Sequence, residues 1–474
     1  MSKYRISIIG MGVLVAFGSQ VIAKDTKPNI ILVMADDLGW GDTAYNGHPF
    51  VKTPHLDAMS KSGLRFDQFY AAAPVCSPTR SSVLTGRNPM RVHVLNHGHY
   101  MRPQEETIAE ALKRAGYATG HFGKWHVGSV QKQSPVCPGN SGFDEWISAL
   151  NFFDIDPYLS DNGIAKQYKG ESSKLVVDFT LDFIKKQAEL KKPFLALTWF
   201  ASPHQPWVAV GDDKKLYPEG GKFRKYYQEI TAMDREIGRL LDGLRKLGIE
   251  KNTLVWFCSD NGGLNPKTSG GRGKKGVIYE GGLRVPAIMM WPDKIKQGVT
   301  KFPAFTSDIF PTVLDIVGVK PADSKVLDGI SLKGAIDGTI SKRPKGMGFW
   351  FGFTKGQATY SDAIVKQIMI AQKAGKKIAI PSRLKKDIDE FPQYSNTSFP
   401  GHSAWIDWPW KLHRIEKCNK KSSAISAFAL YNLETDPMET HNVAKMNPER
   451  VIIMKKKMFD WNSSVINSLN GKDY

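Results

Sequence analysis

The sequence lacks any long hydrophobic run. No stretch of about 18 apolar residues occurs in the 474-residue chain, which argues against a membrane-spanning helix. One shorter run, residues 6–17, follows Lys3 and Arg5 and leads to small residues at 21–23. This order is typical of a secretory signal peptide, with a buried N-terminal helix as the alternative. We therefore expect residues 1–23 to be a signal peptide and the mature protein to be exported, to the periplasm or outside the cell.

Cysteine is also scarce, with four residues whose spacing matches no zinc-binding pattern. Cys258 lies in an apolar run and is expected to be a buried core thiol, whereas Cys137 and Cys418 are free to pair or not. That leaves Cys76, followed by a Ser-Pro-Thr-Arg segment that predicts a tight turn carrying Arg80. Cys76 has three interpretations: half of a disulfide, a thiol nucleophile, or a thiol converted into an oxygen group that binds a metal.

Acidic residues are outnumbered: 65 Lys and Arg face 46 Asp and Glu, for a formal net charge of +19. Such a surface attracts polyanions. An exported protein rarely meets nucleic acid, so a sulfated or carboxylated polysaccharide is the expected partner, with a merely lysine-rich composition as the alternative. The 11% aromatic content is that of a globular chain and excludes general disorder.

Short apolar runs alternate with amphipathic helical patterns over the first 260 residues. The runs are 28–37, 116–126, 192–204 and 252–263, and the helical patterns are 107–116, 173–190 and 226–248. This rhythm predicts an α/β fold with a large, mainly parallel sheet sandwiched by helices. After about residue 340 the rhythm fades. We expect a catalytic domain over 24–345 and a smaller α+β C-terminal domain over 346–474, with antiparallel strands and a contribution to the substrate pocket.

Each apolar run leads into polar residues capable of chemistry. Because sites in open α/β sheets form at the carboxyl ends of the strands, these polar ends are expected to converge on one crevice. Alone, Asp-Asp or Asp-Asn-Gly is most often a turn. Two such pairs after buried strands favour a hard cation such as Ca²⁺ or Mg²⁺, which prefers oxygen ligands. The oxygen-bearing residues are Asp36, Asp37, Asp260 and Asn261.

A second set of residues is basic. Lys124, His126, His204 and Lys275 near a metal crevice would bind a tetrahedral anion and move protons. Lys275 lies in the glycine-rich segment 270–286, which lets the backbone approach a ligand, with a flexible surface loop as the alternative. The segment lacks the Lys-Ser/Thr end of a phosphate-binding P-loop.

The segment CSPTRSSVLTGR (76–87) resembles the signature of the formylglycine-dependent sulfatases, members of the alkaline phosphatase superfamily. Further segments follow in the family's order between about 28 and 445, namely ADDLGWGD, GKWHVG, SPHQPW, SDNGG, GKKGVIYEGGLRVP and YNLETDPMETHNVA. The resemblance implies an alkaline phosphatase-like fold and a sulfuric ester hydrolase.

The resemblance also implies a modified residue and a metal. Cys76 would be oxidised to Cα-formylglycine by a maturation enzyme and would join Asp36, Asp37, Asp260 and Asn261 as a ligand of one Ca²⁺. One oxygen of the hydrated aldehyde would attack sulfur in line, with Asp260 accepting its proton.

The remaining implied roles concern charge and protons. His204 or Lys275 would protonate the leaving alcohol, and His126 would take the proton from the second diol oxygen as sulfate leaves. Arg80 would stabilise the diol, and Lys124 and Lys275 the sulfuryl oxygens. Spacing back from Glu280 in the family loop favours Lys275 over its basic neighbours as the catalytic lysine.

The substrate is expected to be a sulfated polysaccharide or oligosaccharide. Arg272 and Lys274 are candidates for a second anionic group of the substrate. Trp207, Trp350 and Trp405 are candidates for stacking on sugar rings, with core packing the favoured alternative for each. Two other functions stay open: a phosphonate monoester or phosphodiester hydrolase of the same superfamily, and a non-catalytic binder of sulfated glycans.

Overall fold

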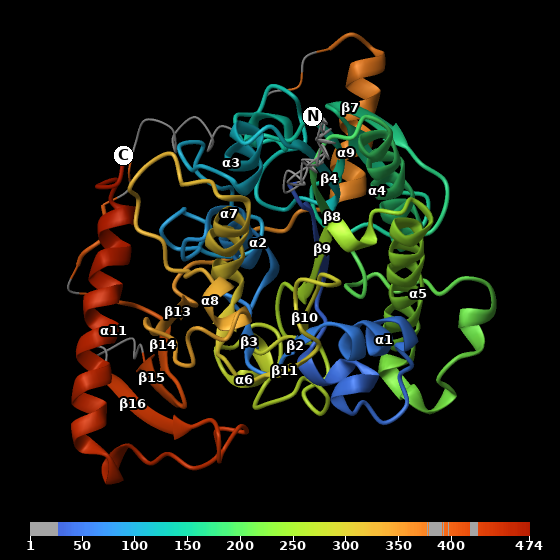
Figure 1. Cartoon of the computed structure of the whole chain (residues 1–474). Helices are drawn as coiled ribbons and strands as arrows, with labels where there is room; N and C mark the ends of the chain where they lie inside the picture. Colours follow the sequence, from blue (N-terminus) through green and yellow to red (C-terminus); the bar gives the residue numbers. More distant parts are fainter. Residues whose placement is uncertain (1–26, 377, 379–390, 392, 397, 418–424) are drawn as a thin grey trace, which may run out of the picture.

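A computed structural model describes residues 27–376, 378, 391, 393–396, 398–417 and 425–474 (Figure 1). The expected signal peptide, residues 1–23, and Cys418 lie outside these residues. Export and a Cys137–Cys418 disulfide therefore stay predictions. Within the described part of the chain, no helix is both long and apolar enough to cross a bilayer.

The main sheet has ten strands in the described residues, and its centre is parallel. Strand β1 pairs in parallel with β9 on one side and β8 on the other, and β8 pairs in parallel with β4. Every residue of these four strands is buried. The four apolar runs therefore form strands, as predicted, and they are neighbours. In sheet order the strands are β11 (Gly298–Thr300), β2 (Leu64–Phe66), β10 (Ala287–Met290), β9 (Thr253–Ser259), β1 (Asn29–Ala35), β8 (Phe194–Trp199), β4 (Ala118–Lys124), β5 (Glu145–Ala149), β6 (Tyr158–Asp161) and β7 (Ile164–Gln167).

Helices cover both faces of this sheet, each through its apolar side (Figure 1). On one face lie α1 (Pro54–Ser62), α4 (Ser172–Glu189) and α5 (Arg224–Lys246). On the other lie α2 (Cys76–Thr85), α3 (Ile108–Arg114) and α7 (Ile309–Val317). The predicted helical patterns correspond to α3, α4 and α5.

A second, antiparallel sheet lies beside the first and is covered by the C-terminal helix (left in Figure 1). The predicted fold class, a helix-sandwiched and mainly parallel sheet with a smaller antiparallel part, is confirmed. The domain boundary at 345/346 stays a prediction. The elements are β13 (Met347–Phe351), β14 (His402–Asp407), β15 (Trp410–Lys417), β16 (Ile425–Asn432) and α11 (Pro448–Leu469).

The remaining elements are short helices, a two-stranded sheet, and the segment that joins β13 to β14. Between β13 and β14 the chain returns to the far edge of the main sheet, where α9 packs against β6 and β7. Residues 352–360 therefore run from the antiparallel sheet to the edge of the main sheet. The elements are α6 (Glu280–Leu283), α8 (Lys333–Ile336), α9 (Ser361–Lys373) and the strand pair β3 (Phe69–Tyr70) with β12 (Ala304–Phe305).

The segment after Cys76 is helical, so the predicted tight turn is wrong. Cys76 is the first residue of α2, and Pro78 lies in its first turn. Proline is tolerated there because the first N–H groups of a helix have no partner within it. Arg80 follows Cys76 by one turn, which puts both side chains on the same face of α2.

Candidate active site

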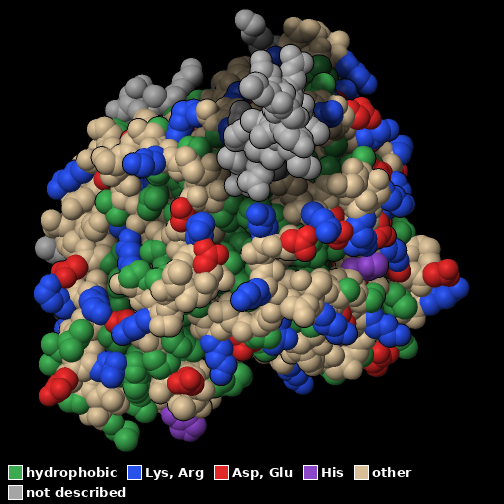
Figure 2. Space-filling view, in the orientation of Figure 1, with side chains coloured by type: hydrophobic (Ala, Val, Ile, Leu, Met, Phe, Trp, Pro, Cys, Tyr) green, Lys and Arg blue, Asp and Glu red, His purple; other side chains and the backbone are tan. Residues whose placement is uncertain are grey.

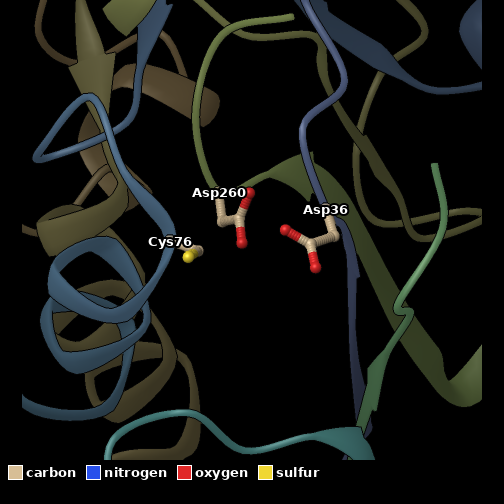
Figure 3. A group of neighbouring side chains, drawn as sticks. All are labelled: Asp36, Cys76 and Asp260. Carbon is tan, nitrogen blue, oxygen red and sulfur yellow. The ribbon is translucent and has the colours of Figure 1, made fainter. Parts of the chain in front are cut away.

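Polar residues from four adjacent strands meet at the carboxyl edge of the main sheet, as predicted. Cys76, at the start of α2, reaches toward the carboxylates of Asp36 and Asp260 (Figure 3). The Cys76 sulfur and one oxygen from each carboxylate lie within 4.8 Å of one another. Asp36 and Asp37 follow β1, Asp260 and Asn261 follow β9, Lys124 ends β4, and His204 follows β8.

Arg80 is fixed beneath this group. Its Nε and Nη2 donate to Asp260 Oδ2 at 3.0 and 2.7 Å, and its Nη1 donates to the Lys124 carbonyl at 2.8 Å. The side chains of Arg80 and Asp260 are fully buried. Two bonds that converge on one buried carboxylate oxygen, with a third to a backbone carbonyl, leave the guanidinium little freedom, so Arg80 is a fixed positive charge one helical turn from Cys76.

Two lysines balance the negative charges of the other two aspartates, Asp36 and Asp37. Lys124 Nζ lies 2.6 Å from Asp36 Oδ2, and Lys275 Nζ lies 2.6 Å from Asp37 Oδ1. Asn261 Nδ2 also donates to Asp37 Oδ1 at 2.8 Å. The backbone N–H of Lys275 donates to the Gly263 carbonyl, which ties the glycine-rich segment to the end of β9.

Several buried polar atoms of the site have no hydrogen-bond partner among the described residues: Asp36 Oδ1, Asn261 Oδ1 and both ring nitrogens of His126. A buried acceptor without a partner costs about 1–3 kcal/mol, so two of them at the same edge of the sheet need an explanation. Open oxygen acceptors from a carboxylate and an amide fit a hard cation such as Ca²⁺. Asp37 and His126 also adopt left-handed backbone conformations, with φ of 72° and 57°, a strain that clusters at functional sites.

The acids differ in how readily they ionise. Burial, reinforced by Asp36, raises the pKa of Asp260 to about 6 in spite of Arg80. Burial also opposes ionisation of Asp37, but the nearby lysine charges, Lys275 first and then Lys124, outweigh it and hold the pKa of Asp37 below its usual value. A bound cation would favour the ionised form of both carboxylates.

The imidazoles and the thiol are held neutral. Burial, with Lys275 and Lys124, lowers the pKa of His204 to about 3 although Asp37 opposes the shift. Burial and the Lys124 charge lower the pKa of His126 well below its usual value. Burial raises the pKa of the Cys76 thiol, and the two lysines offset this only in part. A thiol with a raised pKa is a poor nucleophile, which argues against the thiol interpretation of Cys76.

A cavity of about 300 Å³ opens above Cys76. Phe152 stacks on His204, with ring centroids 5.1 Å apart and planes 10° apart. His126, His204 and Lys275 line the cavity together with residues that the sequence analysis missed, namely His97, Asn151, Phe152 and 358–360. Asn151 and Phe152 follow β5, which pairs in parallel with β4, so recognising that short strand would have found them.

The predicted substrate contacts do not line this cavity. Arg272 lies over the Tyr279 ring at 4.0 Å and donates to the Glu439 carbonyl, and Lys274 is exposed. Trp207 is half-buried, and its Nε1 donates to the Pro203 carbonyl. The sugar-stacking hypothesis for Trp350 and Trp405 is wrong: they are 4% and 6% exposed and pack in the core beneath α11.

The fold and the crevice define a hydrolase of the alkaline phosphatase superfamily. The Sulfatase family model matches residues 28–319, from the approach to β1 through α7. The chain belongs to this family and is a sulfuric ester hydrolase.

Named relatives agree. N-acetylgalactosamine-6-sulfatase of Sus scrofa is 34% identical over 374 residues, which are 70% of this chain and 70% of that protein. Ulvan-active sulfatase of Formosa agariphila is 32% identical over 325 residues, 63% of each chain. The crystal structure of Ps i-CgsB in complex with k-i-k-neocarrahexaose has a TM-score of 0.74 at 25% identity and covers 92% of this chain and 93% of that one.

Proposed function

We propose that this enzyme removes sulfate from a sulfated carbohydrate, with residue 76 acting as Cα-formylglycine beside a Ca²⁺ ion. The observation that carries the proposal is a pair of buried oxygens, Asp36 Oδ1 and Asn261 Oδ1, that have no hydrogen-bond partner among the described residues. The Cys76 sulfur, an Asp36 oxygen and an Asp260 oxygen lie within 4.8 Å of one another, and Cys76 and Lys275 line the cavity. Asp36, Asp37, Asp260 and Asn261 would hold the ion together with residue 76. When bound, Ca²⁺ supplies positive charge for the sulfuryl oxygens.

The chain's own cations and imidazoles divide the remaining work. Lys124 and Lys275, held by Asp36 and Asp37, orient the sulfuryl group and offset its charge. Arg80 keeps the Asp260 carboxylate oriented, so that it accepts the proton of the attacking hydroxyl at residue 76. His126, neutral and with both nitrogens unbonded in the described residues, is suited to take the second proton from residue 76 as sulfate leaves.

Protonation of the leaving alcohol falls to His204 or Lys275, which both line the cavity. Asp37 raises the pKa of Lys275 in spite of burial, so the lysine carries a proton at neutral pH. His204 is neutral in the free enzyme, and the negative charge of a bound sulfate ester would raise its pKa. A pH profile of kcat that retains its limb on the alkaline side in Lys275→Ala but loses it in His204→Ala would assign the role to His204, because the rate falls as a general acid loses its proton.

The carbohydrate substrate is supported by relatives named for N-acetylgalactosamine 6-sulfate and ulvan, and by a neighbour solved with a neocarrahexaose. The net charge of +19 suits a polyanionic substrate. We further propose that the enzyme is exported and that a maturation enzyme converts Cys76, before folding buries it in α2.

The test is sulfate release from 4-nitrophenyl sulfate, N-acetylgalactosamine 6-sulfate, ulvan and k-i-k-neocarrahexaose, with the mass of the tryptic peptide ending at Arg80 determined on the same preparation. We expect turnover of at least one carbohydrate, an aldehyde mass at residue 76, and no activity in Cys76→Ala. Activity on the aryl sulfate alone would overturn the carbohydrate substrate.

Two further measurements separate the other proposals. A thiol mass in an active preparation contradicts the formylglycine. Metal analysis should find calcium, whereas zinc or manganese together with phosphodiester turnover would point to the phosphonate and phosphodiester hydrolases of the superfamily. An inactive protein that binds the glycans with an aldehyde at residue 76 would point to a non-catalytic binder.

A further inference from the structure

One wall of the cavity is built by Asn151, which has no part in the charge network around Cys76. Asn151 follows β5 and is 6% exposed, and it lines the same cavity as Cys76. The hydrogen bonds of the aspartates, lysines and Arg80 in the site do not include it. Asn151 therefore faces the cavity and is not tied to the charged residues around Cys76.

The orientation of the Asn151 amide follows from its one anchor. Its Nδ2 donates to the Thr359 carbonyl at 3.0 Å. A carbonyl only accepts hydrogen bonds, so the amino group must face Thr359 and the amide oxygen must face away from it. That oxygen, Oδ1, is buried and has no hydrogen-bond partner within the described residues.

A buried amide oxygen without a donor costs about 1–3 kcal/mol, which a ligand donor would recover. The ligand group that meets it cannot be a second sulfate, since sulfate oxygens are acceptors and would be repelled. It must carry an O–H or N–H group. On a sulfated sugar, ring hydroxyls and acetamido groups lie next to the sulfate ester and supply such donors.

We propose that Asn151 is a specificity-determining residue whose Oδ1 accepts a hydrogen bond from a hydroxyl or amide N–H of the sulfated sugar ring. The inference rests on the proposed carbohydrate function. It deepens that function by naming the chemistry read beside the sulfate ester, a neutral donor. A site built to satisfy a buried polar group rejects ligands that lack the partner.

The test compares two substrates in the Asn151→Leu variant, which keeps the side-chain volume and removes the amide. The substrates are 4-nitrophenyl sulfate, which has no hydroxyl or N–H donor, and whichever of N-acetylgalactosamine 6-sulfate, ulvan oligosaccharide and k-i-k-neocarrahexaose the wild type turns over fastest. We expect kcat/KM on the carbohydrate to fall about 10–100-fold and kcat/KM on the aryl sulfate to stay within about threefold.

Asn96→Leu is the matched control. Asn96 is also buried and also anchors the 352–360 segment, through Nδ2 to the Thr354 carbonyl at 2.7 Å. Its Oδ1 is already used by the His97 N–H, and it does not line the cavity. Asn96→Leu should loosen the same segment, and it should therefore change kcat/KM by the same factor on both substrates.

Three results overturn the proposal. In Asn151→Leu, kcat/KM falls equally on both substrates or falls on neither. Alternatively, Asn96→Leu shows the same loss of kcat/KM on the carbohydrate alone. Failure of the underlying function is recognised separately, because it shows in the wild type as turnover of the aryl sulfate without turnover of any carbohydrate. That result overturns both.

Discussion

Two buried charge clusters each include a residue of the glycine-rich segment, Lys275 in one and Glu280 in the other, and they differ in whether their hydrogen-bond acceptors are satisfied. The catalytic cluster consists of Asp36, Asp37, Asp260, Asn261, Arg80, Lys124 and Lys275. The inter-sheet cluster consists of Lys411, Glu280, Glu439 and His413. In the inter-sheet cluster Lys411 Nζ lies 2.9 Å from Glu280 Oε1 and 3.1 Å from Glu439 Oε1, and His413 Nε2 lies 2.7 Å from the same Glu439 oxygen.

The inter-sheet cluster is closed, whereas the catalytic cluster is open. The other oxygen of Glu439 accepts the Glu280 N–H at 2.6 Å, and the second nitrogen of His413 lies 2.8 Å from His402. In contrast, Asp36 and Asn261 each keep an oxygen without a partner among the described residues. A closed buried network fixes how two parts of a chain pack, while an open one is left for a ligand to complete.

The largest effect expected from this comparison is on stability. Lys411→Met leaves Glu280 and Glu439 buried without their cation and should lower the free energy of unfolding by about 3–5 kcal/mol. Urea unfolding measures it. The control is Lys457→Met, which removes an exposed lysine paired with Asp407 and should cost less than about 1 kcal/mol. Similar losses in the two variants would mean that the inter-sheet cluster does not hold the sheets together.

A substitution in the catalytic cluster should instead lower the rate of sulfate release. Lys275→Ala should lower kcat on 4-nitrophenyl sulfate about 10²–10³-fold, because it removes a fixed charge beside the sulfuryl oxygens. The free energy of unfolding, measured with Ca²⁺ present, should change by less than in Lys411→Met. A kcat within tenfold of the wild type would remove Lys275 from the catalytic group.

A third buried acidic site, around Asp154, also has open acceptors, and no cation of the described residues pairs with it. Both oxygens of Asp154 are buried without a partner in the described part of the chain. Burial, then the charges of Glu171 and Asp362, raise its pKa to about 7, and burial together with Asp154 raises the pKa of Glu229 to about 8. Asp154 favours the folded state most below pH 4, and this contribution is lost as the pH rises through 7.

The free energy of unfolding of the wild type should therefore fall as the pH rises from 5 to 8, while an amide at position 154 does not titrate. Over this range Asp154→Asn should gain on the order of 1–3 kcal/mol relative to the wild type. Urea unfolding at several pH values in that range measures the difference. Asp156→Asn is the control: a hydrogen bond from Lys169 lowers the pKa of Asp156, which is ionised across the range, so its curve should run parallel to the wild type. A parallel curve for Asp154→Asn would show that the carboxyl is ionised in the fold.

The sequence predicts the catalytic cluster better than the inter-sheet cluster, because the residues of the catalytic cluster follow a pattern that is visible within short segments. Each strand end in the catalytic cluster is marked by an apolar run followed by polar residues, and parallel neighbours bring such ends together. Glu280 and Glu439 are 159 residues apart, and no spacing rule relates them. The same holds for Asn151 and Thr359, which meet through a segment without periodicity.

Two errors have equally physical causes. The turn predicted after Cys76 is a helix because a proline in the first turn removes no hydrogen bond that the helix needs. Aromatic residues in the C-terminal part suggested a sugar-binding surface, but the exposure of a tryptophan depends on what packs over it. Here α11 covers Trp350 and Trp405.

The smallest expected effect separates two adjacent lysines. Lys274 is exposed and does not line the cavity, whereas Lys275 pairs with Asp37 and does. Lys274→Ala should therefore change kcat on 4-nitrophenyl sulfate by about twofold or less, as an exposed substitution does. Steady-state kinetics of Lys274→Ala and Lys275→Ala, measured in parallel, test this difference in kcat. If the two variants lost activity to the same extent, the charge of the whole segment would matter rather than the single cation that the Asp37 carboxylate holds in place.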